Sequence, residues 1–255
     1  MPIPLVEGIV YGPVRSRRLG RSLGVNVLPR GLKVCNMDCA YCQYGWTRRR
    51  STVGRREQWP PPERIEAVVS ARLRKAECSD ELIDRLTVAG HGEPTLHPAF
   101  EEIAERLYGL RDHLAPDIRL AVLSNSTTAG RADVRQGLAL FDERYMKLDA
   151  GDPITYASIN RTGSLRTVVD ALRDLPSIVV QAMFVSDEFG QVDNTLERPV
   201  QAWLDAVDTI QPSRVQVYSI ARPPALCGLR RPKTGRLREI AERVRALGIP
   251  ADVFK

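Results

Sequence analysis

From about residue 60 onward, short apolar runs alternate with longer amphipathic stretches, the pattern of repeated β-α units around a parallel sheet. The predicted strands are residues 23–28, 85–89, 118–124, 145–150, 178–185 and 214–220. The predicted helices are residues 63–75, 100–113, 132–140, 165–175, 196–210 and 235–247. Pro60-Pro61-Pro62 suits the start of the first helix, and Gly248 with Pro250 marks the end of the last.

Six such units in 255 residues predict an α/β fold, a partial (open) parallel (β/α)6 barrel rather than a closed eightfold one. A flat, doubly wound sheet has the same alternation, so periodicity alone leaves both open. At 43% hydrophobic residues we expect a single domain over residues 1–255, with a basic N-terminal segment at 1–22 and the partial barrel at 23–250. Catalytic groups are expected at the carboxyl ends of the strands.

The net charge of +6 adds the possibility of an anionic partner. Arginines gather at 15–21 and at 48–56, on both sides of a cysteine cluster. Such loops are either solvated or contact a substrate anion or nucleic acid, and both interpretations stay open. The chain begins with no secretion signal and has no apolar stretch of membrane-spanning length, so we expect a soluble, cytoplasmic protein with no membrane partner.

Three of the five cysteines lie within eight residues, in the spacing Cys35-x3-Cys39-x2-Cys42. An odd number of cysteines packed this closely fits a metal site better than a disulfide framework. Three thiolates can bind three irons of a 4Fe-4S cluster and leave the fourth iron open. A structural zinc, the rival interpretation, needs four ligands in paired spacing, which the sequence lacks.

A second motif, Gly90-His91-Gly92-Glu93-Pro94-Thr95, follows the second predicted strand. Glycines let the backbone approach a ligand closely, and a carboxylate or carbonyl at a strand end can accept hydrogen bonds from an ammonium group. The next strand ends in Ser124-Asn125, which are either ligand contacts or ordinary turn residues.

Together these motifs resemble those of the radical S-adenosylmethionine (SAM) superfamily, with His91 at the position of the first glycine of the family's Gly-Gly-Glu-Pro segment. The resemblance implies a barrel of the radical SAM type with a 4Fe-4S cluster and SAM as cofactors. It also implies an external flavodoxin-like or ferredoxin-like electron donor. In the family, reductive cleavage of SAM gives a 5'-deoxyadenosyl radical that abstracts hydrogen from the substrate. The SAM-binding residues expected here are Tyr41, Gly92, Glu93, Pro94, Ser124, Asn125 and Gln181.

Side chains alternate between the faces of a strand, which predicts the residues that face the barrel interior. If Met146 and Leu148 pack under the helices, Lys147 and Asp149 face inward. The same alternation predicts that Gln216 and Tyr218 of the last strand face inward. Two prolines follow Arg222 directly after this strand, and we expect this rigid segment to hold Arg222 at the barrel mouth. The candidate substrate or catalytic residues are thus Lys147, Asp149, Gln216, Tyr218 and Arg222. A purely structural Lys147–Asp149 ion pair is the alternative.

At a finer level, the N-terminal segment from Tyr11, the Lys147-Leu148-Asp149-Ala150 run and the exit at Arg222 resemble small proteins related to the wybutosine-synthesis radical SAM enzymes, which modify tRNA. We therefore expect an enzyme acting on a polar small molecule or a nucleotide. The alternatives are a tRNA-modifying enzyme and, in another class, a non-catalytic iron-sulfur carrier or sensor. Cys78 and Cys227 are too few to bind a second cluster.

Overall fold

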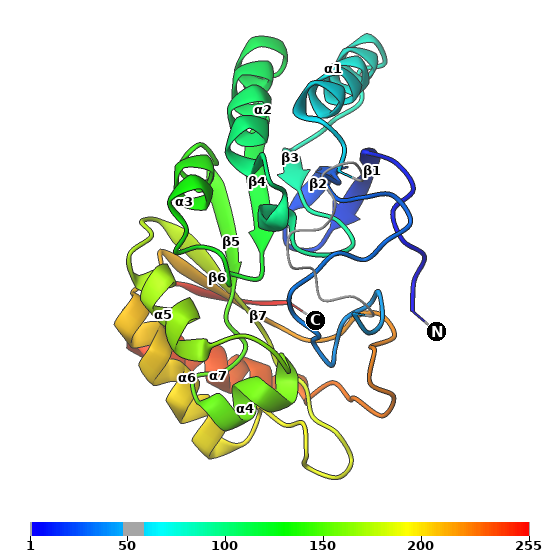
Figure 1. Ribbon diagram of the computed structural model, residues 1–255. Helices are drawn as coiled ribbons and strands as arrows, with labels where there is room; N and C mark the ends of the chain where they lie inside the picture. The colour runs from blue at the N-terminus through cyan, green and yellow to red at the C-terminus, as the bar shows by residue number, and fades with distance from the viewer. Residues whose placement is uncertain (1, 48–58, 255) are drawn as a thin grey trace.

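The computed structural model describes residues 2–47 and 59–254, in which eight strands form one sheet in chain order (Figure 1). Strand β1 pairs antiparallel with β2, and every later neighbour pair is parallel. The strands are β1 Val10–Ser16, β2 Gly20–Val25, β3 Arg85–Val88, β4 Arg119–Ser124, β5 Glu143–Lys147, β6 Ile178–Met183, β7 Arg214–Tyr218 and β8 Ala251–Phe254. The sheet curves into a half-barrel, which confirms the predicted open barrel over the flat alternative.

The longer helices cover the outer face of the curved sheet in Figure 1. The helices of the described residues are α1 Pro62–Cys78, α2 Phe100–Leu114, α3 Ala132–Ala139, α4 Pro153–Ile159, α5 Leu165–Arg173, α6 Glu197–Ile210 and α7 Thr234–Ala246, with a short 3-10 helix, η2, at Pro94–Leu96. Helix α6 illustrates why they form. Its buried residues recur every three or four positions and make one apolar stripe: Val200, Trp203, Leu204, Val207 and Ile210.

The main core lies between these helices and the outward side chains of the strands. Met146 and Leu148 are buried in it, as are Val215 and Val217, so the predicted alternation in β5 and β7 is correct. Trp203 is buried in the same core and donates a hydrogen bond from its ring to the carbonyl of Leu148, just after β5, at 2.9 Å. No described helix is long and apolar enough to span a membrane.

Among the elements of the described residues, two strands and two helical segments were not predicted from the sequence. Strand β1 lies in the segment that we expected to precede the barrel, where Pro13 and closely spaced arginines obscure the alternation. Strand β8 is only four residues long and follows the expected end of the barrel. Helix α4 and η2 are too short to show a helical period.

The turn between β1 and β2 covers the amino-terminal end of the half-barrel. Leu19, at the turn, is 4% exposed and packs against Ala121 and Tyr145, which face inward from β4 and β5. Arg85 donates a hydrogen bond to the Leu19 carbonyl at 2.8 Å, and Arg21 forms an ion pair with Asp84. The turn is therefore held in place under the barrel interior.

Candidate functional site

One cavity of about 1020 Å³ occupies the barrel interior and opens beside the cysteine loop. Cavities that hold a small ligand measure roughly 300–1,000 Å³, so this one lies at the upper end of that range. Of the predicted site residues, those lining it are Cys35, Tyr41, Cys42, Gly92, Glu93, Ser124, Asn125, Lys147, Gln181, Tyr218 and Arg222. Cys39, Pro94, Asp149 and Gln216 do not line the cavity.

The cysteine loop is fixed by backbone hydrogen bonds to distant parts of the chain. Val34 pairs with Gly92 in an isolated bridge, and the Glu93 N–H donates to the Val34 carbonyl at 2.9 Å. Further along, Ala40 donates to the Ile159 carbonyl and accepts from the Leu226 N–H, both at 2.8 Å. The loop is thus tied to β3, α4 and the segment after β7.

The three cysteines of the loop are free thiols, each partly buried. Asn125 Nδ2 lies 3.7 Å from Cys35 Sγ, and Asn160 Nδ2 lies 3.4 Å from Cys39 Sγ. Burial raises the pKa of Cys35 to about 12 and that of Cys39 to about 11, so both are protonated when no metal is bound. Binding to iron would deprotonate them, because a metal stabilises the thiolate.

This donor set fits a 4Fe-4S cluster better than a single ion. Within residues 2–47 and 59–254, no group of three or more His, Cys, Asp or Glu side chains could hold one metal ion as placed. In a 4Fe-4S cluster each cysteine binds a different iron, so three thiols of one loop suffice for three irons. A mononuclear zinc site, which needs four converging ligands, does not fit.

Gly92 is required where the second motif meets the cysteine loop. A Cβ atom there would lie 1.7 Å from the Val34 carbonyl oxygen, so no other residue fits. The neighbouring His91 is fully buried and does not line the cavity. Its Nδ1 accepts from the Val6 N–H at 3.2 Å and its Nε2 lies 3.0 Å from the Pro29 carbonyl, while burial lowers its pKa. His91 therefore holds the N-terminal segment and the start of the loop.

Glu93 is a buried carboxylate that joins the ends of β3 and β4. Its Oε1 accepts from the Thr95 N–H at 3.1 Å, the Thr95 hydroxyl at 2.6 Å and the Ser124 hydroxyl at 3.0 Å. Its Oε2 accepts from the Asn125 N–H. Burial raises the pKa of Glu93, and it does so by more than these four hydrogen-bond donors lower the pKa. A carboxylate oxygen has two lone pairs, so Oε2 can accept one more hydrogen bond from a ligand.

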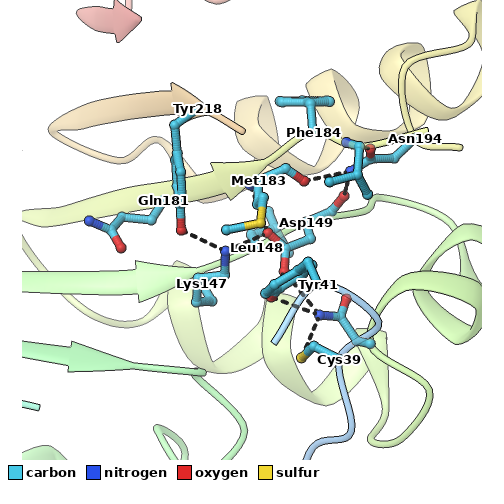
Figure 2. A network of polar contacts seen from close by, with 12 residues as sticks. Cys39, Tyr41, Lys147, Leu148, Asp149, Gln181, Met183, Phe184, Asn194 and Tyr218 are labelled. Atoms are coloured by element: carbon cyan, nitrogen blue, oxygen red, sulfur yellow. Dashed lines mark hydrogen bonds and ion pairs between the residues drawn. The ribbon is translucent and has the colours of Figure 1, made fainter. Parts of the chain in front are cut away.

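Figure 2 shows a polar network centred on Asp149, which follows β5. One oxygen, Oδ2, accepts from the Tyr41 hydroxyl and from Asn160 Nδ2, the latter at 2.9 Å. The other, Oδ1, accepts from the Met183 N–H and pairs with Lys147 Nζ, both at 2.8 Å. The Asp149 side chain is completely buried. Asp149 itself does not line the cavity, but its partners Tyr41, Lys147 and Met183 do. Asp149 therefore supports the cavity wall from the side that faces away from the cavity.

Lys147 is the member of this network that reaches the cavity. Its Nζ also donates to the Tyr218 hydroxyl at 2.8 Å and lies 4.7 Å from the centre of the Tyr41 ring. Burial lowers the pKa of Lys147, but Asp149 and Tyr218 raise it by more, so it ends above its usual value and the side chain is an ammonium. The structure thus contains the Lys147–Asp149 ion pair and also turns the lysine toward the cavity.

Gln181 and Gln216 are cross-strand neighbours on β6 and β7. Gln181 lines the cavity and its Nε2 donates to Gln216 Oε1 at 2.8 Å, so Gln216 supports Gln181 from the next strand. Arg222 is exposed at the mouth, as its Pro-Pro exit predicts.

Sequence reasoning missed the roles of two residues, Arg18 at the cavity and Asn160 behind the cysteine loop. Arg18 was considered only as part of a basic segment, yet it lies over the Tyr218 ring, 4.0 Å from its centre. Asn160 ends α4 and bonds to Cys39, Tyr41 and Asp149, which no local signal indicates. The arginines at 48–50 and 55–56, for which the sequence left a substrate or nucleic-acid contact open, lie outside the described residues.

Comparisons with known proteins agree with this geometry. A family model for the radical SAM superfamily matches residues 32–179, which include the cysteine loop and both strand-end motifs. The UPF0026 protein MJ1312 of Methanocaldococcus jannaschii is 42% identical over 153 residues, which are 60% of this chain and 44% of that protein. The chain thus spans less than half of that relative. The UPF0026 protein slr1464 of Synechocystis is 31% identical over 226 residues, which are 85% of this chain and 77% of that protein.

Solved structures share the fold. A radical SAM methyltransferase from Sphaerobacter thermophilus has a TM-score of 0.65 at 16% identity, over 91% of this chain and 65% of that one. Streptococcus suis SuiB, solved with SAM bound, has a TM-score of 0.63 at 12% identity, over 91% of this chain and 50% of that one. Both of the relatives named above carry the UPF0026 name, and neither singles out the wybutosine group. The chain belongs to the radical SAM superfamily, whose enzymes use a 4Fe-4S cluster and SAM, and within it to the UPF0026 proteins.

Proposed function

We propose that this chain is a radical SAM enzyme that binds a 4Fe-4S cluster through Cys35, Cys39 and Cys42. When bound, the cluster and SAM supply a 5'-deoxyadenosyl radical for hydrogen abstraction, after one electron from a flavodoxin-like or ferredoxin-like donor. The protein's own part is to hold these groups and to keep a substrate beside them.

SAM is proposed to lie between the cysteine loop and the ends of β3 and β4. Glu93 Oε2 and nearby backbone carbonyls would accept hydrogen bonds from the SAM ammonium group, and Ser124 and Asn125 fix the carboxylate of Glu93 for this purpose. Because Gly92 has no side chain, the strand-end motif can lie directly against Val34 at the start of the cysteine loop. Tyr41 and Gln181 line the same cavity, whereas Pro94 is buried and shapes η2.

The substrate is proposed to be a polar small molecule or a nucleotide in the rest of the cavity. The observation that carries this proposal is one cavity of about 1020 Å³ lined by Cys35 and Cys42 and also by Lys147 and Tyr218. A carrier or sensor of electrons needs no such polar space next to its cluster, so the cavity favours an enzyme. Asp149 and Gln216 would act as positioning residues, because neither lines the cavity.

A tRNA substrate is the second candidate. Arg15, Arg17 and Arg222 at the cavity favour a partner with many phosphates, as does the resemblance to the wybutosine group. We prefer the small substrate because the cavity of about 1020 Å³ already presents Lys147, Gln181 and Tyr218 to a small polar molecule. A tRNA substrate would show binding that falls steeply with salt and that exceeds binding to unrelated RNA.

The proposed function is tested by reconstituting the protein anaerobically with iron and sulfide, adding dithionite and SAM, and measuring 5'-deoxyadenosine and methionine. We expect slow cleavage without substrate, and none in a variant with Cys35, Cys39 and Cys42 all replaced by alanine. If the reconstituted protein cleaves no SAM with dithionite or with reduced flavodoxin, the enzyme proposal is wrong and the carrier interpretation is favoured.

A further inference from the structure

We propose that Arg18 and Lys147, which meet on the side chain of Tyr218, form a subsite for an oxyanion, the carboxylate or phosphate group of a small substrate. The inference rests on the proposed function in that this anion belongs to the molecule on which the enzyme acts. Binding of an anion to this subsite can nevertheless be measured without SAM cleavage.

Arg18 comes from the turn between β1 and β2 and is held in place on two sides. The Arg18 and Leu19 N–H groups donate to Ser16 Oγ at 3.3 and 3.2 Å, and the buried Leu19 anchors the turn. The guanidinium lies over the Tyr218 ring at 4.0 Å. Its Nη1 is shielded from solvent and has no hydrogen-bond partner within the described chain. A guanidinium fixed in this way, with a free donor beside a cavity, is suited to bind a planar carboxylate or a phosphate.

Lys147 approaches the same tyrosine from β5. Its Nζ lies 4.9 Å from the Tyr218 ring centre and donates to the hydroxyl of that ring. An ammonium has three N–H donors, and Asp149 and Tyr218 use two of them. The third is left for the cavity that Lys147 lines.

The lining of the cavity that contains this pair is strongly cationic. Arg15, Arg17, Arg222 and Arg231 also line the cavity, and none of them forms an ion pair with any residue that the structure describes. Most described arginines elsewhere do have a carboxylate partner, such as Arg106 with three glutamates. Among the described lining residues Glu93 is the one acid, and its carboxylate already accepts four protein hydrogen bonds.

The Arg18 side of this subsite lies apart from most of the residues proposed to hold SAM. Most of those residues are on the cysteine loop and at the ends of β3 and β4, whereas Arg18 lies on the turn before β2 and stacks on Tyr218 of β7. Lys147 is closer to the SAM residues, since it pairs in register with Gln181 and its Nζ lies 4.7 Å from the centre of the Tyr41 ring. A substrate anion at Tyr218 would leave the rest of its molecule to extend through the cavity toward the cysteine loop.

The test measures binding of simple anions to the cluster-reconstituted protein at constant ionic strength. The probes are inorganic phosphate and succinate, with chloride as the reference, and binding is followed by calorimetry. We expect Arg18→Gln and Lys147→Met each to weaken binding of the preferred anion by roughly tenfold or more, since each removes a charge-assisted hydrogen bond. Tyr218→Phe keeps the ring under Arg18 and should weaken binding less than Arg18→Gln does. The matched control is Arg238→Gln, an exposed arginine of α7 outside the cavity, which should bind as the wild type does.

The outcomes separate the alternatives. Preference for phosphate or for succinate identifies the source of the oxyanion and supports the subsite in either case. Equal anion binding by wild type and Arg18→Gln would overturn the inference, as would a loss of SAM affinity in Arg18→Gln with anion binding unchanged. Binding of tRNA but of neither small anion would overturn it in favour of an RNA partner. Arg18-dependent anion binding in a protein that never cleaves SAM would support the subsite and refute only the proposed function.

Discussion

The Tyr41 hydroxyl donates a hydrogen bond to the Asp149 carboxylate, across 108 residues of sequence. Tyr41 belongs to the cysteine loop, between the second and third cysteines, and Asp149 follows β5. The same carboxylate accepts from Lys147, so the loop and the cavity lysine share one anchor (Figure 2). A change at Asp149 should therefore affect both sides of the site.

The first prediction concerns this anchor. Asp149→Asn leaves the Lys147 ammonium without its carboxylate in a largely buried place, and we expect the free energy of unfolding to fall by about 3 kcal/mol. Tyr41→Phe removes a single hydrogen bond and should cost about 1 kcal/mol. Urea unfolding of the metal-free protein, followed by circular dichroism, measures both.

The control for this prediction is Asp170→Asn, because the ion pair of Asp170 with Arg166 is exposed and should contribute little. The double variant Lys147→Met with Asp149→Asn should be less destabilised than the sum of the two single variants, since it removes both charges. Equal effects of Asp149→Asn and Asp170→Asn would show that the buried pair is not an anchor.

The second prediction uses the five cysteines as their own control. Cys35→Ala, Cys39→Ala or Cys42→Ala should each abolish the 4Fe-4S spectrum after reconstitution, because each removes the ligand of one iron. Cys78→Ala and Cys227→Ala should keep full iron and sulfide content, since both are exposed and lie outside the loop. Iron analysis and absorbance decide the matter, and tightly bound zinc with no iron uptake would refute the cluster.

The third prediction separates SAM binding from cluster binding. Glu93→Gln keeps the shape of the side chain but replaces a carboxylate oxygen by an amide, and we expect SAM affinity to fall roughly tenfold with iron content unchanged. The spectral change of the cluster on SAM titration measures the affinity. Glu102→Gln, on the outer helix α2, is the control and should titrate as the wild type. Unchanged affinity in Glu93→Gln would limit Glu93 to holding β3 and β4 together.

The fourth prediction is a pH dependence of stability at His97, which is buried against Trp59. Its Nδ1 accepts from the Ala99 N–H at 3.0 Å and its Nε2 lies 3.1 Å from the Pro60 carbonyl, so the neutral ring is well matched. Burial lowers its pKa from 6.5 to about 4. The stability that His97 contributes is therefore present above pH 6.5 and is lost as pH falls through about 4, an effect of roughly 2–3 kcal/mol.

Unfolding measured between pH 7 and pH 4 checks this prediction. His97→Gln should show a flatter profile than the wild type, whereas His113→Gln, at an exposed position of α2, should keep the wild-type slope. The comparison must be made between variants, because the raised pKa of Glu93 acts in the opposite direction over part of this range. Parallel profiles for His97→Gln and the wild type would contradict the prediction.

By itself the sequence determined the repeating β-α pattern, the cysteine loop and the strand-end motif, because these depend on neighbours within a few residues. The spacing of Cys35, Cys39 and Cys42 is enough to indicate a site for an iron-sulfur cluster. The side-chain alternation of β5 and β7 was also predictable, since successive residues of a strand must face opposite sides. These local rules were enough to identify the superfamily and to predict that Lys147 and Tyr218 face the barrel interior.

Only the tertiary structure decided which polar groups meet one another. Asp149 seemed equivalent to Lys147 in the strand pattern, but Tyr41 of the cysteine loop and Asn160 at the end of α4 bond to its carboxylate, and Asp149 does not line the cavity. Arg18 seemed to belong to a solvated segment until the β1–β2 pairing brought it under the barrel and against Tyr218. Such contacts join residues far apart in the chain, and they depend on the curvature of the whole sheet, which no short stretch of sequence encodes.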